Sequence, residues 1–207
     1  MIPQKAIDLI LEEEGIDQPG RWPGGGSGIT LGYGCDIGTD PASLDFWVGI
    51  LDSDQIDRLR TAKGITGRSA AQIQTRFHDI KVTEAQARDV FMRQSLPREE
   101  RLTTAAFPGS ENLPGLVFGA LVSLVYNRGT SLDPRDDRRR EMRAIHDAIV
   151  NSQQNAEGED PQIRQNNLLR FIAGQLRFMK RIWVGQGLDG LLKRRDAEAD
   201  LVASAIA

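Results

Sequence analysis

The segment GITLGYGCDIG, at residues 28–38, alternates apolar residues with small or polar ones. Alternation with a period of two is typical of a β-strand, and glycines in the middle of such a run indicate a tight turn. We therefore predict a short β-hairpin over Ile29–Ile37 that turns at Gly32–Gly34. The preceding residues 15–28 are rich in glycine and also contain prolines, which predicts a loop.

An amphipathic helix is expected before this loop. Ile10, Leu11 and Glu14 lie three, four and seven residues after Ile7, so the four side chains form one stripe of a helix that ends at Gly15. A carboxyl group on such an apolar stripe is desolvated, which raises its pKa and suits it to act as a general acid. The alternative is that Glu14 reaches water at a fraying helix end, or pairs with a buried arginine.

From about residue 41 onward the pattern is helical. Thr83 with Gln86 forms a capping box, and Pro114 opens a strongly apolar helix that ends near Gly129. The other expected features are helix caps at Ser53 or Asp54 and at Ser69, a bend or end at Pro97, an amphipathic helix over 137–151, a polar loop over 152–161, and helices over 162–183 and 188–205. We predict a single α+β domain over residues 1–207, with a small N-terminal lobe (about 1–80) that contains the hairpin and a larger, mostly helical lobe (about 81–207).

The composition argues against several classes of protein. The 207 residues can bury a full core, and 26 basic against 29 acidic residues give a net charge of -3, without the basic excess of a nucleic-acid binder. A single cysteine, Cys35, excludes an intrachain disulfide framework, and two histidines are too few for a zinc site. No apolar run approaches the ~20 residues of a membrane-spanning helix. We therefore expect no nucleic-acid partner, no stable membrane insertion and no metal.

Three segments, in this order, resemble one known family. They are Glu14-Gly15 followed after a loop by the Gly-x-Thr-aliphatic-Gly-Tyr-Gly run of residues 28–34, then ALVSLVYNRGT at 120–130, then WVGQGLDGLLKRRDAE at 183–198. They are similar to the active-site signature, the central helix and the closing Trp…Gly-Leu…Arg-Arg-x-x-Glu element of the phage-type lysozymes, glycoside hydrolase family 24. The resemblance implies a lysozyme-like fold and a muramidase, which hydrolyses the β-1,4 bond between N-acetylmuramic acid and N-acetylglucosamine in peptidoglycan.

The sequence departs from the phage pattern at one catalytic position. The phage enzymes carry an aspartate six residues before the threonine, where this chain has Gly24, whereas Asp36 lies six residues after Thr30. The order Glu, Thr, Asp resembles the muramidase domain of the bacterial toxin pesticin. The resemblance implies a catalytic triad of Glu14, Thr30 and Asp36.

The residue types of this triad suit glycoside hydrolysis. The reaction needs a proton donor to the leaving oxygen and a second carboxyl group that stays ionised across the sugar. Glu14 on an apolar stripe suits the first role, and Asp36 on a glycine-rich hairpin suits the second. The Thr30 hydroxyl can hold a water beside Asp36, so we favour direct attack by water over a covalent sugar–enzyme ester. Two carboxyl groups and water suffice, so no cofactor is expected.

The resemblance also implies four substrate-binding residues: Trp22, Tyr33, Asn127 and Arg195. Arg195 is expected near Glu14 as an ion pair, or else on a solvated helix face with Arg194. Asn127 is expected in the cleft, or as a helix C-cap. Trp22 and Tyr33 are expected to contact sugar, or to brace the loop.

Three further features have two interpretations each. Trp183 is expected to stack on a sugar ring or to belong to the core. The run DDRRREMR at 136–143 is a basic patch for nucleic acid or the anionic cell wall, or, with its acids nearly cancelling its charge, a solvated face. Cys35 is expected to be a packed thiol rather than a nucleophile.

The expected partners are peptidoglycan glycan strands. The N-terminus lacks the features of a secretory signal peptide, so we expect synthesis in the cytoplasm and delivery to the periplasm or cell wall, by a secretion system as an antibacterial toxin or through a holin pore as a phage endolysin. An injected toxin would have an immunity protein that plugs the cleft. Two other functions stay open: a non-catalytic peptidoglycan-binding or structural module, and a lytic transglycosylase, which needs the glutamate but no second carboxylate.

Overall fold

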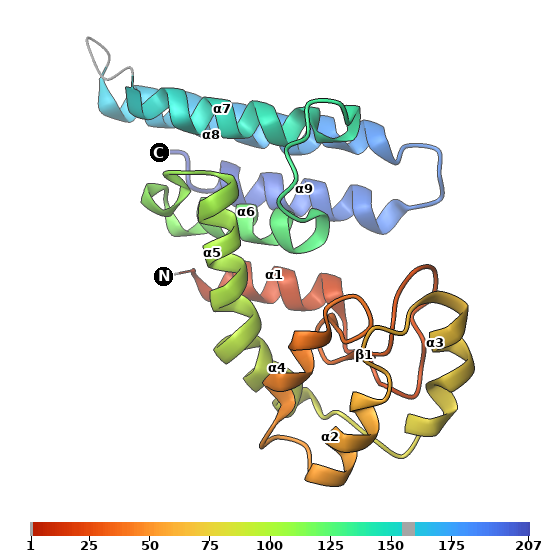
Figure 1. The fold of residues 1–207 in the computed structure, drawn as a ribbon. Coiled ribbons are helices and arrows are strands. Elements are labelled where there is room, and N and C mark those ends of the chain that lie inside the picture. Colours follow the sequence, from red (N-terminus) through yellow and green to blue (C-terminus); the bar gives the residue numbers. More distant parts are fainter. Residues whose placement is uncertain (1, 155–159) are drawn as a thin grey trace. The chain divides into compact units, whose positions relative to one another are not determined.

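The computed structural model describes residues 2–154 and 160–207 and is mostly helical, with one small two-stranded antiparallel sheet (Figure 1). This agrees with the predicted α+β class. The chain divides into two compact units, one of Glu14–Pro97 and one of Met1–Glu13 with Arg98–Ala207. The boundary lies after Pro97 rather than near residue 80, and most of the first helix groups with the C-terminal residues.

The unit of residues 14–97 contains the hairpin. Strand β1 (Thr30–Leu31) pairs with β2 (Cys35–Asp36) in antiparallel register, with Thr30 opposite Asp36 and Leu31 opposite Cys35. The turn requires glycine because Gly32 and Gly34 have φ angles of +58° and +73°, in the left-handed region. The predicted hairpin and its glycine turn are confirmed.

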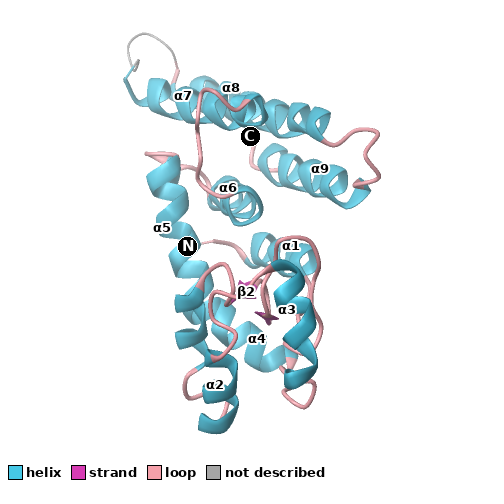
Figure 2. Ribbon diagram, turned by 45° about the vertical axis from the view of Figure 1, so that its right-hand side comes forward, coloured by secondary structure: helices cyan, strands magenta, loops and turns pink. Residues whose placement is uncertain are grey.

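Short helices surround the hairpin in this unit (Figure 2). They are η1 (Pro41–Trp47), α2 (Ser53–Arg60), α3 (Gly67–Ile73), η2 (Gln74–Phe77), α4 (Glu84–Val90) and the π-helical turn η3 (Phe91–Ser95). The capping box of Thr83 and Gln86 is confirmed. The other two expected caps are wrong, because the N-cap of α2 is Asp52, and α3 begins at Gly67, before Ser69, with Thr66 as an N-cap that makes no side-chain bond.

The other unit is a helical assembly. Its elements are α1 (Gln4–Glu14), α5 (Leu96–Ala106), η4 (Ser110–Asn112), α6 (Gly115–Arg128), η5 (Asp137–Arg139), α7 (Arg140–Gln154), α8 (Pro161–Phe178), η6 (Met179–Ile182) and α9 (Asp189–Ala203), with the ends of α1 and α5 crossing the unit boundary. Helix α8 packs against α7 and α9, and α9 packs against α6 (Figure 1). Most residues of α6 are buried, which agrees with its apolar sequence.

The helical run in which Pro97 was expected to act does not stop at Pro97, but it is irregular just before it, because the π-helical turn η3 separates α4 from α5. Pro97 lies in the first turn of α5, where a missing N–H is tolerated, directly after the π-helical turn. Helix α7 extends to Gln154, and residues 155–159 of the predicted polar loop lie outside the described residues. Among the helices that the structure describes, none combines the length and the apolarity of a membrane span.

Candidate functional site

The Asp36 carboxylate organises the loop around the hairpin. Its Oδ1 accepts hydrogen bonds from the backbone N–H groups of Gly28, Gly38 and Thr39 at 3.0, 2.9 and 3.1 Å, and its Oδ2 accepts one from Gly28 at 2.9 Å. Hydrogen bonds from amides to a carboxylate are charge-assisted and strong. The side chain therefore ties the residue that leads into β1 to the turn that follows β2.

The glycines next to Asp36 make this closure possible. A Cβ on Gly28 would lie 2.5 Å from the Asp36 Oδ1 and 2.4 Å from the Gly38 Cα, and a Cβ on Gly38 would lie 2.4 Å from the backbone oxygen of Ile65. Real Cβ atoms do not approach so closely, because the packed interior leaves no such overlap. The sequence thus places glycine where two backbone segments meet over the carboxylate.

Thr30 shares one face of the hairpin with Asp36. The two residues are directly opposed in the register, and side chains of opposed residues project from the same face of a sheet. Thr30 is only 4% exposed, and its hydroxyl donates a long hydrogen bond of 3.4 Å to the backbone oxygen of Gly28. The predicted pair of Thr30 and Asp36 is therefore brought together by the backbone pairing itself.

Glu14 is the last residue of α1. The helix ends there because Gly15 adopts a φ of +63°. Glu14 is half-buried, whereas Glu12 and Glu13 are exposed. This difference agrees with the prediction that Glu14 alone of the three lies on the apolar stripe.

The structure adds a carboxyl group that the sequence analysis missed. Asp17 forms an isolated bridge with Gly32, with its N–H donating to Gly32 O at 2.7 Å and its C=O accepting from Gly32 N–H at 2.9 Å. Gly32 directly follows β1, so this bridge holds Asp17 beside the turn of the hairpin. Asp17 has no pattern that would single it out, since only the path of the loop brings it to the hairpin.

Asp17 is electrostatically coupled to two predicted catalytic residues. Its pKa is raised to about 6, first by burial and then by the nearby carboxylates of Glu14 and Asp36, while Arg21 acts in the opposite direction. Glu14 and Asp36 therefore both lie close enough to Asp17 to raise its pKa, and all three residues belong to a single unit. Within residues 2–154 and 160–207, however, no three His, Cys, Asp or Glu side chains converge to form a metal site.

The aromatic residues near the hairpin have structural contacts. The Trp22 Nε1–H donates to Ser27 O at 2.8 Å, and the Trp22 backbone N–H donates to the Gln74 side-chain oxygen at 2.7 Å, so Trp22 braces the loop. Tyr33 is 6% exposed and packs edge-to-face on Phe91, with 5.9 Å between ring centres. The Tyr33 ring is therefore part of the core rather than a surface for sugar stacking.

Arg195 is fully buried in the helical unit and donates to Glu198 Oε1 at 2.7 Å and to Asn127 Oδ1 at 3.4 Å. Its neighbour Arg194 is 2% exposed and donates to Ser123 O at 3.0 Å. The interpretation of these arginines as a solvated face is therefore wrong. A fully buried guanidinium is also out of reach of a substrate in this conformation, so direct substrate binding by Arg195 is corrected to a structural ion pair. The predicted ion pair of Arg195 with Glu14 stays a prediction.

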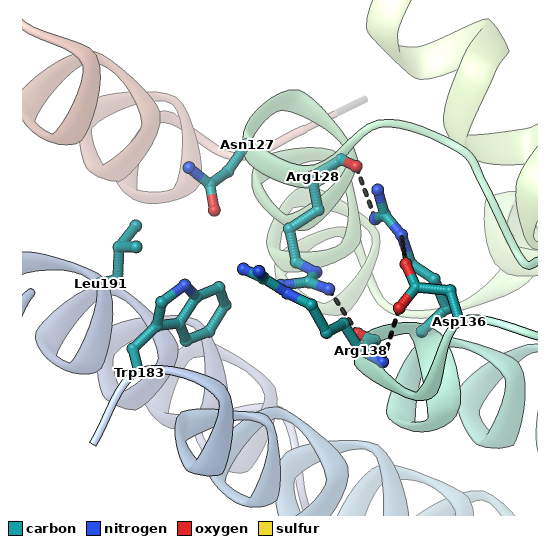
Figure 3. Close-up of a pocket in the computed structure, with 7 residues that line it drawn as sticks. Asn127, Arg128, Asp136, Arg138, Trp183 and Leu191 are labelled. Atoms are coloured by element: carbon teal, nitrogen blue, oxygen red, sulfur yellow. Dashed lines mark hydrogen bonds and ion pairs between the residues drawn. The ribbon is translucent and has the colours of Figure 1, made fainter. Parts of the chain in front are cut away.

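Asn127 lies in the last turn of α6. Gly129, with a φ of +70°, takes the left-handed position at the helix end, so Asn127 is not the C-cap. Asn127 instead lines a pocket together with Trp183 (Figure 3). Trp183 is only 4% exposed, which favours its interpretation as a core residue. Cys35 is buried too, as expected of a packed thiol.

No protein-family model matches the chain, and a search of curated proteins finds no relative. The functional argument therefore rests on the residues and their geometry. The candidate site consists of the carboxyl groups of Glu14, Asp17 and Asp36 and the hydroxyl of Thr30. All four residues belong to the unit of residues 14–97.

Proposed function

We propose that this protein is a muramidase with a lysozyme-like fold, which hydrolyses the β-1,4 bond between N-acetylmuramic acid and N-acetylglucosamine in bacterial peptidoglycan. The observation that supports the proposal is that Thr30 and Asp36 are opposed in the hairpin, while the carboxylates of Glu14 and Asp36 both raise the pKa of Asp17 in the same unit. Glycosidases act through two carboxyl groups that flank the scissile bond. Glu14 lies at the end of α1 and Asp36 in β2.

The three predicted catalytic residues would have distinct roles. Glu14, half-buried at the end of α1, donates the proton to the leaving oxygen. The Asp36 Oδ2 accepts one amide bond, from Gly28, and uses its other lone pair to accept a proton from the attacking water. Thr30, on the same face as Asp36, orients that water through its hydroxyl.

Asp17 is a second candidate for the proton donor. With a pKa of about 6, its carboxyl group retains a substantial protonated fraction in mildly acidic solution. A general acid works best when its pKa lies near the working pH. Variants at positions 14 and 17 therefore have to be compared in the same assay.

A lytic transglycosylase is the second candidate function. The observation that favours it is the commitment of the Asp36 carboxylate to three backbone amides, which suits a structural role. A transglycosylase needs one acid/base group and no carboxylate to position water. Its products differ from those of a hydrolase because they end in 1,6-anhydro sugars.

The proposal is tested by measuring reducing ends released from purified peptidoglycan. Glu14→Gln removes the proton donor and is expected to lower the rate at least about a hundredfold, the usual scale of general acid catalysis. Glu12→Gln, an exposed position on the same helix, is the matched control and is expected to keep the wild-type rate. Wild-type protein that binds peptidoglycan and releases nothing would instead identify a non-catalytic binding module.

A further inference from the structure

The helical unit contains a pocket of about 390 Å³, which lies outside the hairpin unit and is lined by none of Glu14, Thr30 and Asp36 (Figure 3). Its wall includes three guanidinium groups, from Arg128, Arg138 and Arg139, together with the carboxylate of Asp136 and the ring of Trp183. We call it the arginine pocket. Its residues come from the end of α6, from η5 with its flanking residues, from the residue after η6 and from the first turn of α9.

The arginine pocket carries surplus positive charge. Asp136, the acidic residue in its wall, has its Oδ2 3.7 Å from the Arg139 Nε. The acids that follow in sequence are engaged elsewhere, since Asp137 and Glu141 both pair with Arg181, at 2.7 and 2.6 Å. Three cations therefore face one anion in the pocket wall.

The neighbouring positive charges affect the pKa of Arg128. Its pKa is lowered to about 10, mainly by burial and then by the like charges of Arg139, Arg195 and Arg138. A guanidinium normally stays protonated far above this value. The like charges thus add to the larger effect of burial, Glu141 acts in the opposite direction, and a bound anion beside Arg128 would offset both burial and repulsion.

The donors of Arg128 are incompletely used. Its guanidinium carbon lies 4.9 Å from the centre of the Trp183 ring, and its Nη2 donates to a neutral group, the backbone oxygen of Arg138. Its Nε is buried and has no hydrogen-bond partner among the described residues. Buried donors are normally satisfied, so an unsatisfied one at a pocket wall indicates a missing partner.

Arg138 contributes a second available guanidinium. Its bonds in this region are made by the backbone, with the N–H donating to Asp136 Oδ1 at 2.9 Å and the C=O accepting from Arg128. The side chain is exposed, and Figure 3 shows it extending toward Trp183 beside Arg128. Two arginines close together offer planar sets of donors that match the oxygens of a carboxylate or phosphate.

We propose that the arginine pocket is a binding site for an oxyanion, a carboxylate or phosphate group, held by the guanidinium groups of Arg128 and Arg138 in front of Trp183. This assigns a function to part of the run at 136–143, which has four arginines and three acids. The site lies wholly within the helical unit. Because the test of this binding site uses no peptidoglycan, its result is independent of the muramidase proposal.

The experiment is calorimetric titration of the full chain with inorganic phosphate and, separately, with acetate, each against chloride at equal ionic strength. We expect saturable binding of at least one oxyanion beyond the chloride baseline. Arg138→Gln is expected to weaken that binding by about tenfold or more, since hydrogen bonds to charged groups contribute more than neutral ones. Because Arg138 is exposed, the substitution leaves the fold intact, which circular dichroism checks.

Arg135→Gln is the matched control. It removes the same charge from the same connection, but Arg135 pairs with Asp133 at 2.8 Å and lies outside the pocket wall. Binding should survive in this variant. Phosphate binding alone or acetate binding alone supports the proposal and identifies the kind of oxyanion. Equal weakening in both variants, or no binding beyond chloride, overturns it.

Discussion

Asp17 holds its proton more tightly in the folded protein than in the unfolded chain. Its pKa rises from 3.8 to about 6, so folding favours the protonated form and wild-type stability falls as the pH rises from about 4 to 6. Above pH 6 the full cost of burying the charge near Glu14 and Asp36 is present. Asp17 is partly exposed, so solvent screening reduces this cost to about 1 kcal/mol.

Asp17→Asn removes the charge and keeps the backbone bridge to Gly32. The variant is expected to be more stable than the wild type by about 1 kcal/mol at pH 7–8, with the difference vanishing below about pH 4. Urea denaturation across this pH range measures the effect. A difference that stays constant with pH would show that Asp17 does not titrate as described.

Gly28 is the residue on which the position of the Asp36 carboxylate depends. A side chain there would overlap both the Asp36 Oδ1 and the Gly38 backbone, so Gly28→Ala is expected to lower the free energy of unfolding by about 2–3 kcal/mol. Gly26→Ala is the control, because a Cβ at that position meets nothing within 4 Å. Equal stability of the two variants would contradict the close approach.

At the scale of elements, α1 and α6 pack closely because Gly119 of α6 has no side chain. A Cβ on Gly119 would lie 2.4 Å from the Ala6 Cβ and 3.0 Å from the Ile2 Cγ2. Gly119→Ala is therefore expected to destabilise the protein by about 1–3 kcal/mol, as overpacking does. Thermal or urea unfolding measures the loss.

The same substitution in α8 provides the comparison. Gly174 has open space around its Cβ position, so Gly174→Ala is expected to stabilise the protein by up to about 1 kcal/mol through helix propensity alone. Opposite signs for the two variants would identify the α1–α6 contact as the cause. Stabilisation by both would mean that α1 and α6 are not closely packed at this point.

The elements that sequence predicts well are those with a local physical cause. The hairpin follows from alternation around Gly32 and Gly34, α1 ends at Gly15, and α4 begins at the capping box of Thr83. The cap of α2 was predicted wrongly because Asp52, Ser53 and Asp54 are all good capping residues, and only the backbone path selects among them.

At the scale of the whole molecule, the missed features depend on residues that are distant in sequence. Asp17 enters the site through its bridge to Gly32, and Tyr33 is buried by Phe91, some sixty residues later. Arg195 is buried where it donates to the distant Asn127 of α6 as well as to Glu198 of its own helix. The sequence alone does not distinguish charged residues on a solvated helix face from charged residues in a buried ion pair.

The division into two units likewise depends on contacts rather than on local pattern. Most of α1 groups with residues 98–207, yet its last residue, Glu14, belongs to the unit that contains the hairpin. The four residues Glu14, Asp17, Thr30 and Asp36 therefore share one compact unit. The proposed muramidase chemistry requires that these residues act together.

The measurement that tests this most directly is mass spectrometry of fragments released from purified peptidoglycan by the wild type, Glu14→Gln and Glu12→Gln. The account predicts fragments with reducing N-acetylmuramic acid ends from the wild type and Glu12→Gln, and almost none from Glu14→Gln. Fragments ending in 1,6-anhydro sugars, no fragments from the wild type, or undiminished release by Glu14→Gln would each contradict it.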